Sequence, residues 1–92
     1  MGLRKISEPI KHLQGSEHLD EIVTTGVWHQ PLSRNADTNL GYPVAEAGLL
    51  EVMSPSGVSM VYQRYTRYNS GNIYHRGHYN GRWAAWRRVQ LD

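Results

Sequence analysis

The sequence predicts a small β-rich domain of the α+β class, in which a short N-terminal helix packs against an antiparallel meander. From Val58 to Val89 the chain holds three β-forming runs, separated by the turn sequences NSG (69–71) and NG (80–81). Asn-Gly between two such runs favours a type I′ hairpin, because both central residues of that turn need positive φ. Helical spacing is confined to one short stretch after Ser16.

The predicted helix begins at Ser16, a favoured N-cap residue. Acidic side chains in its first turns complement the helix dipole, and apolar side chains recur at three-to-four spacing, namely Glu17, Asp20 and Glu21, and Leu19, Ile22 and Val23. Residues 1–15 are polar and are broken by Pro9. We therefore expect residues 1–15 to form a flexible tether and residues 16–92 to form the folded domain.

Two further strands are expected before the meander, at Val27–Gln30, where Pro31 stops the run, and at Gly48–Met53. Residues 31–43 are rich in Asn, Ser, Asp, Gly and Pro, which is typical of a loop with at most one helical turn. Trp83 and Trp86 are three apart and would face opposite sides of a regular strand. If both belong to one core, a bulge or bend is required near residues 84–85.

Composition limits the chain to one modest core. It has 92 residues and no cysteine, which excludes disulfides and cysteine zinc sites and makes oligomerisation the expected extra support. Residues 1–51 carry four basic and seven acidic residues, whereas residues 52–92 carry six arginines and one aspartate. The sequence has no apolar run long enough to span a membrane and no secretory signal at its start, so we expect no membrane insertion.

The meander is aromatic and cationic, and each of its candidate sites has a structural alternative. The tryptophans could stack on sugar rings, but we expect them to close the core of a domain that has no Phe. The arginines could bind phosphates or carboxylates, or most could form a solvated face, and for Arg76 we expect a structural pairing. His75 and His78 would face opposite sides of a strand and cannot chelate one metal there.

An enzyme is not expected. No nucleophile motif is present, and no carboxylate follows Glu51 until the final residue, whereas a glycosidase needs two. We expect neither a cofactor nor a metal.

Several short motifs follow one another in an order that resembles a known family. They are Thr-Gly-Val-Trp-His-Gln (25–30), Tyr-Pro (42–43), Ala-Gly-x-Leu-x-Val (47–52), Tyr-Gln-x-Tyr-Thr (62–66), Tyr-x-Arg (74–76) and Trp-x-x-Trp (83–86). Together they resemble the knob module of phage tail fibres and R-type pyocin fibres, from about Leu19 to Val89. Members of that family usually carry a long fibre shaft, so residues 1–15 would be a tether or the end of a shaft.

The resemblance implies a homotrimeric, virion-associated knob that helps a phage or prophage-encoded fibre adhere to its host. Its partner would be a bacterial surface polysaccharide such as lipopolysaccharide. Its place would be the extracellular virion tail, or the host cytoplasm during assembly. For ligand contacts we select polar and aromatic residues near the turns, because strand centres are needed for packing: Tyr68, Asn72, His78, Tyr79, Asn80 and Arg82.

Two alternatives remain open. The module could serve only the trimerisation and folding of a fibre, with the receptor bound elsewhere. The basic aromatic sheet could instead bind single-stranded nucleic acid, whose bases stack on aromatic side chains. We regard nucleic acid as the weaker alternative.

Overall fold

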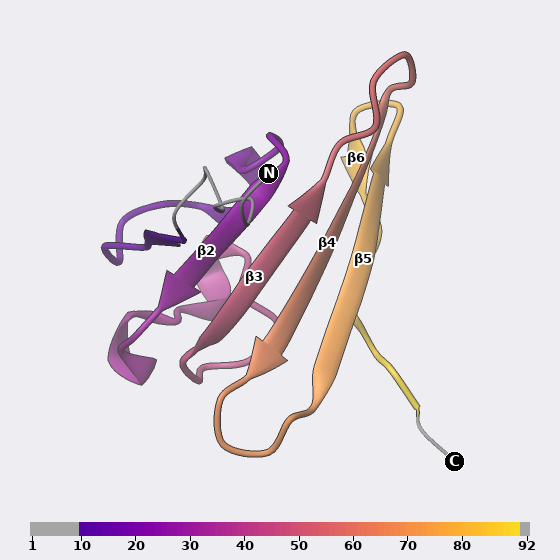
Figure 1. Ribbon diagram of the computed structural model, residues 1–92. Coiled ribbons are helices and arrows are strands. Elements are labelled where there is room, and N and C mark those ends of the chain that lie inside the picture. The colour runs from indigo at the N-terminus through magenta and orange to yellow at the C-terminus, as the bar shows by residue number, and fades with distance from the viewer. Residues whose placement is uncertain (1–9, 91–92) are drawn as a thin grey trace, which may run out of the picture.

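The computed structural model describes residues 10–90 and consists of one twisted sheet with a layer of loops and 3-10 turns on one side (Figure 1). Its strands are β1 (Lys11–His12), β2 (Gly26–Gln30), β3 (Gly48–Met53), β4 (Met60–Arg67), β5 (Ile73–Tyr79), β6 (Arg82–Trp83) and β7 (Arg87–Arg88). The order is β1-β2-β3-β4-β5-β6, and β7 also pairs with β5. All pairs are antiparallel except β1 with β2.

The predicted meander is confirmed, and so is its type I′ turn. β4, β5 and β6 follow one another antiparallel. Asn80 and Gly81 have φ values of 57° and 82°, which is the geometry that the NG dipeptide favours. β3 has the bounds that the sequence predicts, and β2 begins one residue earlier, at Gly26.

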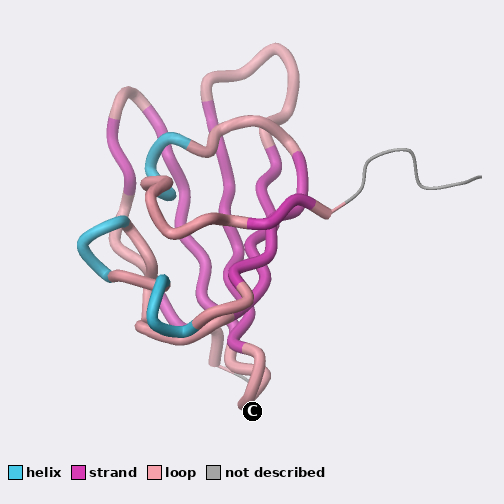
Figure 2. The backbone as a smooth tube through the Cα atoms, turned by 90° about the vertical axis from the view of Figure 1, so that its left-hand side faces the viewer, coloured by secondary structure: helices cyan, strands magenta, loops and turns pink. Residues whose placement is uncertain are grey.

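The predicted N-terminal helix is wrong. In the described residues the chain forms only three 3-10 turns, η1 (Leu19–Glu21), η2 (Ser33–Asn35) and η3 (Thr38–Leu40), seen as short helices in Figure 2. Ser16 is not the cap of η1, because the His18 side chain accepts the hydrogen bond from the Asp20 amide. The domain is therefore β-rich without an α-helix in residues 10–90.

Tertiary contacts explain why the helix does not form. The side-chain amide of Gln63 donates from Nε2 to the carbonyl oxygens of Leu19 (2.7 Å) and Ile22 (3.0 Å). In a continuing helix these carbonyls would accept hydrogen bonds from amides of the helix itself. The Glu17 carboxylate turns back to accept from the amides of Gln14 and Gly15. So short a segment has too few internal bonds to resist these partners.

The last part of the predicted tether lies in the sheet. Lys11 and His12 pair with Trp28 and His29, and Leu13 is buried in the core. Residues 1–9 of that segment lie outside the described residues, so the tether there stays a prediction.

The core lies between the sheet and the layer of turns. Its buried members include Leu19, Tyr42, Leu50, Val52 and Tyr65. Trp28, Trp83 and Trp86 pack against it, which confirms their predicted core role. The third run of the meander is interrupted at residues 84–86, between β6 and β7, close to the expected bend.

A candidate binding face on the sheet

The two faces of the sheet differ completely in exposure. Along β4, Val61, Gln63 and Tyr65 are buried, whereas Met60, Tyr62 and Arg64 alternate with them and are exposed. This alternation is the expected period of two for a strand with one covered face. The covered face meets the 3-10 turns, and the other face lies open over β3, β4 and β5 (Figure 1).

A polar network lies within the covered face. Arg76 on β5 donates from Nε to Gln63 Oε1 (2.9 Å), and its Nη2 atom lies 2.9 Å from Asp20 Oδ1. Burial lowers the pKa of Arg76, while the hydrogen bond and charge of Asp20 act in the opposite direction. This ion pair with Asp20 confirms the structural role expected for Arg76.

The two tryptophans of the Trp-x-x-Trp motif complete this network. The Arg76 guanidinium carbon lies 4.1 Å from the ring centre of Trp83 and 4.5 Å from that of Trp86. Trp83 donates from Nε1 to the Asp20 carbonyl (3.1 Å), and Trp86 donates to the Gly41 carbonyl (2.7 Å). The Tyr-Gln-x-Tyr-Thr, Tyr-x-Arg and Trp-x-x-Trp motifs therefore form one network that holds the 3-10 turns onto the sheet. Most polar groups of this network already have partners within the protein, which leaves few of them for a ligand.

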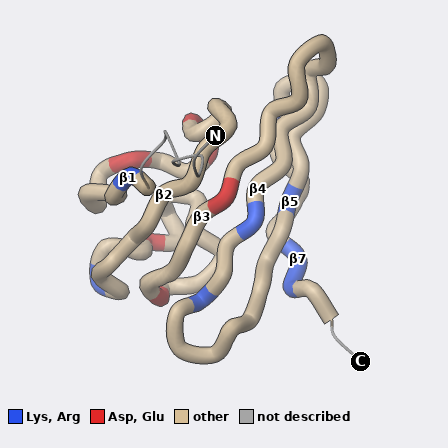
Figure 3. The backbone as a smooth tube through the Cα atoms, viewed as in Figure 1, with Lys and Arg blue, Asp and Glu red and all other residues tan. Residues whose placement is uncertain are grey.

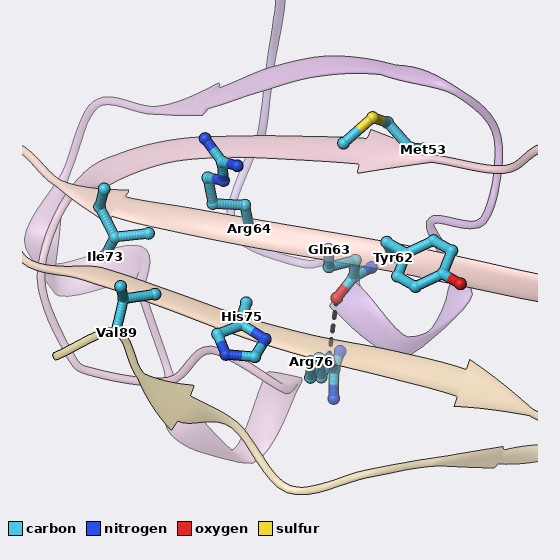
Figure 4. Close-up of a pocket in the computed structure, with 8 residues that line it drawn as sticks. All are labelled: Met53, Tyr62, Gln63, Arg64, Ile73, His75, Arg76 and Val89. Carbon is cyan, nitrogen blue, oxygen red and sulfur yellow. Dashed lines mark hydrogen bonds between the residues drawn. The ribbon is translucent and has the colours of Figure 1, made fainter.

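The open face carries a groove of about 370 Å³ over β4 (Figure 4). In Figure 4, Met53 and Arg64 stand on one side of the groove, and Ile73, His75 and Val89 stand on the other. The residues lining it are Met53, Tyr62, Gln63, Arg64, Ile73, His75, Arg76 and Val89. Gln63 and Arg76 are buried members of the covered face, so the exposed lining combines apolar walls with the guanidinium of Arg64 and the imidazole of His75.

A second groove, of about 240 Å³, adjoins the first at Tyr62. Here Tyr62 pairs with Gly77, and Tyr79 lies two residues further along β5, opposite Met60. Tyr62 and Tyr79 are 47% and 61% exposed, which is unusual for side chains of this size. Gly77 leaves room between them, because a Cβ atom built there would meet only the Val61 carbonyl oxygen, at 3.9 Å.

Basic side chains line up across the open face. Arg64 on β4 is opposite His75 on β5, and His75 is opposite Arg87 on β7. Glu51 on β3 is the next member of the same row, opposite Arg64. Figure 3 shows the basic positions on β4 and β7 and the acidic position on β3.

The six residues selected from the sequence lie at two opposite ends of the sheet. Tyr68 and Asn72 belong to the turn between β4 and β5, whereas Tyr79, Asn80 and Arg82 surround the turn between β5 and β6. The seven residues of β5 separate these groups by about 20 Å. His78 belongs to the second group, but it is half-buried and its ring packs on Trp83 (4.9 Å between centres). A single ligand therefore cannot contact all six residues unless it is long enough to reach both ends of the sheet.

The sequence reasoning missed Tyr62, Met60 and Gly77. The selection of residues near the turns left out Tyr62, although its side chain is exposed in the single chain. Because Val61, Gln63 and Tyr65 alternate with their neighbours along β4, their positions in the sequence could have assigned each side chain to one of the two faces. Gln63, however, breaks the apolar pattern that would have marked the covered one.

His75 and His78 face opposite sides of β5, as their spacing predicts. His75 is exposed on the open face and His78 points to the covered side. No group of three or more His, Cys, Asp or Glu side chains that could hold a metal ion occurs in residues 10–90. Within the same range, no helix is long and apolar enough to cross a membrane.

Comparison with known proteins gives a consistent result. No protein-family model and no curated sequence matches the chain. Among solved structures, an R2-type pyocin tail fibre is 32% identical with a TM-score of 0.79, and the match covers 94% of this chain and 34% of that one. The R1 pyocin fibre of P. aeruginosa is 30% identical with a TM-score of 0.80, over 95% of this chain and 23% of that one.

An Acinetobacter phage tailspike is 20% identical with a TM-score of 0.74, covering all of this chain and 18% of its own, and this likeness extends to the fold alone. The chain thus spans about a third or less of the length of the structures that it matches. Fold and sequence agree with the resemblance that the motifs indicated. Over nearly its whole length, the chain therefore matches a part of R-type pyocin tail fibres in both fold and sequence.

Proposed function

We propose that this domain is a knob module that takes part in host-cell surface recognition by binding a bacterial envelope glycan, such as lipopolysaccharide. The observation that carries the proposal is the pair of exposed tyrosines, Tyr62 and Tyr79, on either side of Gly77 on the open face of a tail-fibre domain. Its location would be the virion tail.

The chemistry of the second groove suits a sugar. The C–H faces of a pyranose ring pack on aromatic π surfaces, and two tyrosines diagonal to one another across adjacent strands are close enough to contact one ring or two linked rings. Gly77 leaves the floor between them open. The exposed side chains of Asn80 and Arg82 lie beside Tyr79 and supply hydrogen-bond donors for hydroxyl groups.

Binding without cleavage fits this surface better than catalysis. Glycoside hydrolysis needs two carboxylates at a controlled separation. β4 and β5, whose residues line most of both grooves, carry no carboxylate. The proposal therefore gives the domain a recognition role.

We further propose that the domain works as a homotrimer, as the resemblance to tail fibres implies. A single groove of this size would bind a sugar weakly, whereas three copies on one particle raise the effective affinity through avidity. The exposed apolar side chains of Met53 and Met60 make the same face a rival candidate for the subunit interface. A test must therefore separate glycan binding from assembly.

The test measures binding of the chain to purified lipopolysaccharide and to a bacterial glycan array, with light scattering on each variant. Tyr79→Ala and Tyr62→Ala should each weaken binding by several-fold to about tenfold, since one aromatic contact contributes ~0.5–1.5 kcal/mol. Tyr68→Ala is the matched control, because Tyr68 is more exposed (68%) than either tyrosine of the groove and lies at the other end of the sheet.

Two results would overturn the proposal. If the folded wild-type chain binds no glycan, the domain has a purely structural role in its fibre. If Tyr62→Ala and Tyr79→Ala abolish the trimer but leave glycan binding by the resulting monomers unchanged, the open face is a subunit interface and the glycan site lies elsewhere.

A further inference from the structure

The row of basic side chains across the open face is not used by the tyrosine site. Arg64, His75 and Arg87 come from three adjacent strands and are all exposed. Adjacent strands lie about 4.8 Å apart, so the backbones of the first and last members are about 10 Å apart. All three side chains stand on one face, at one level of the sheet.

The two arginines of this row differ from Arg67 and Arg76 in their partners. Arg76 pairs with Asp20, and Arg67 lies 3.8 Å from Glu46. Within residues 10–90, by contrast, no ion pair involves Arg64 or Arg87, although Glu51 is directly opposite Arg64. Their guanidinium groups are therefore available to a ligand.

The groove beside the row determines what kind of ligand fits. Its volume of about 370 Å³ lies at the lower end of the range for small-molecule sites. Ile73, Val89 and Tyr62 give it apolar walls, while Arg64 and His75 supply N–H donors at its sides. One sugar ring with an acidic substituent matches both features, because guanidinium forks bind phosphate and carboxylate oxygens in the same way.

We propose that the groove over β4 is a subsite for an acidic sugar, with the phosphate or carboxylate group on the Arg64–His75–Arg87 row and the ring against Tyr62, Ile73 and Val89. The inference rests on the proposed function in that the ligand is a glycan, and it adds that the glycan is anionic. Tyr62 lies in both grooves and would join this subsite to the tyrosine site.

Glu51 makes the electrostatic potential differ between the two ends of the row. Glu51 is opposite Arg64 at the β3 end of the row, so its negative charge repels an anion there and leaves it attracted toward β7. Removing that carboxylate must therefore strengthen anion binding, whereas removing a guanidinium must weaken it. These opposite signs distinguish a specific site from a general effect of net charge on one variant.

The experiment is an amide NMR titration of the whole chain with glucose 1-phosphate, glucuronate, glucose and inorganic phosphate. Both acidic sugars should shift amides of β4, β5 and β7 and bind at least about tenfold more tightly than glucose or inorganic phosphate. Arg64→Gln and Arg87→Gln should each weaken this binding roughly tenfold. Glu51→Gln should strengthen it several-fold.

Arg88→Gln is the matched control, because it removes the same charge one residue along β7, opposite Tyr74 rather than His75. It should change the affinity by less than about twofold, as expected for a screened charge on the other face. Equal losses in Arg87→Gln and Arg88→Gln would overturn the proposal, as would equal binding of glucose and the acidic sugars. That second result leaves the proposed glycan site intact, whereas a chain that binds acidic sugars here but no envelope glycan contradicts the proposed function alone.

Discussion

The two faces of the β4–β5 hairpin carry similar residues, but these residues have different roles on each face. On the covered face, Gln63 and Arg76 form a closed network with Asp20 and two tryptophans. On the open face, the next residues in each strand, Arg64 and His75, are exposed and line a groove. Arg76 and Arg64 thus lie on neighbouring strands, one register position apart, yet Arg76 is buried in the network that holds the fold together and Arg64 is exposed.

The difference shows that residue type alone is a poor guide to function in this sheet. Tyr65 is fully buried and donates to the Glu46 carbonyl (2.6 Å), whereas Tyr62 on the same strand is 47% exposed. What separates them is the parity of their position, because side chains of a strand alternate between faces. Paired substitutions, one on each face, test this comparison directly.

The largest expected effect comes from Arg76→Ala. Arg76 is buried although Asp20 is half-exposed, and the substitution should cost about 3 kcal/mol, because Gln63 and Asp20 lose their partner and the two indoles lose the guanidinium that they contact. The thermal midpoint should fall by roughly 12 °C or more. Tryptophan fluorescence during thermal unfolding measures it.

Arg64→Ala is the control on the open face and should change the stability by no more than about 0.5 kcal/mol. Equal destabilisation by the two substitutions would mean that the open face is packed as tightly as the covered one, and would contradict the assignment of a free surface.

A smaller effect is expected when alanine replaces a strand glycine. A Cβ atom on Gly48 would meet the Thr66 carbonyl oxygen and the Tyr65 ring, so Gly48→Ala should cost about 1–3 kcal/mol through overpacking. Gly77→Ala on β5 has open space and should leave stability nearly unchanged, although it should weaken glycan binding by narrowing the second groove. Urea denaturation of both variants checks the pair, and a stable Gly48→Ala variant would show that β4 can move away.

Removing one hydroxyl group from each face should give a still smaller difference. Tyr65→Phe loses a buried hydrogen bond to the Glu46 carbonyl and should cost about 0.5–1.5 kcal/mol. In Tyr62→Phe the lost hydroxyl contacts only the Met60 sulfur at an exposed site, so stability should change by no more than about 0.5 kcal/mol. Denaturant midpoints of the two variants measure the difference, and a larger loss in Tyr62→Phe would reverse the assignment of faces.

The Tyr65 hydroxyl also predicts a pH dependence. Burial, with smaller contributions from Tyr42 and Glu46, raises the pKa of Tyr65 above its ordinary value. Its stabilising effect is present below a pH of about 10, the pKa of an unfolded tyrosine, and is lost as the pH rises further. The stability of Tyr65→Phe should therefore fall less steeply above pH 10 than that of the wild type.

The smallest effect is expected at Glu17, in the layer that covers the sheet. Partial burial acts to raise the pKa of Glu17, but backbone amides, those of Gln14 and Gly15 among them, hydrogen-bond its carboxylate and lower the pKa overall. Its contribution is present above the pKa of an unfolded glutamate and is lost as the pH falls through the lowered folded value. Glu17→Gln should cost roughly 0.5–1 kcal/mol at neutral pH and nothing in strong acid.

Glu21→Gln is the control, because no hydrogen bond to the Glu21 carboxylate occurs in residues 10–90. Urea denaturation at pH 7 and at pH 3 compares the two variants. A constant difference between Glu17→Gln and the wild type across that range would show that the carboxylate charge contributes nothing.

Much of the fold follows from local signals. The β-forming runs predict β2 to β5, Asn80-Gly81 predicts its turn, and the two tryptophans predict both their core position and a break between them. These features depend on neighbouring residues: φ preferences, β propensity and side-chain size act over a few positions along the chain. The order of the motifs in addition predicts the match to R-type pyocin tail fibres.

Only the tertiary structure decides which face of the sheet is covered and which is open to a ligand. Gln63 is polar yet buried, because it bonds carbonyls of a turn 41 and 44 residues away, and the same bonds replace the expected helix by η1. The selected site residues divide between two ends, since β5 extends between their turns. Exposure depends on what packs above a side chain, and that contact joins segments whose distance in sequence leaves no local signal.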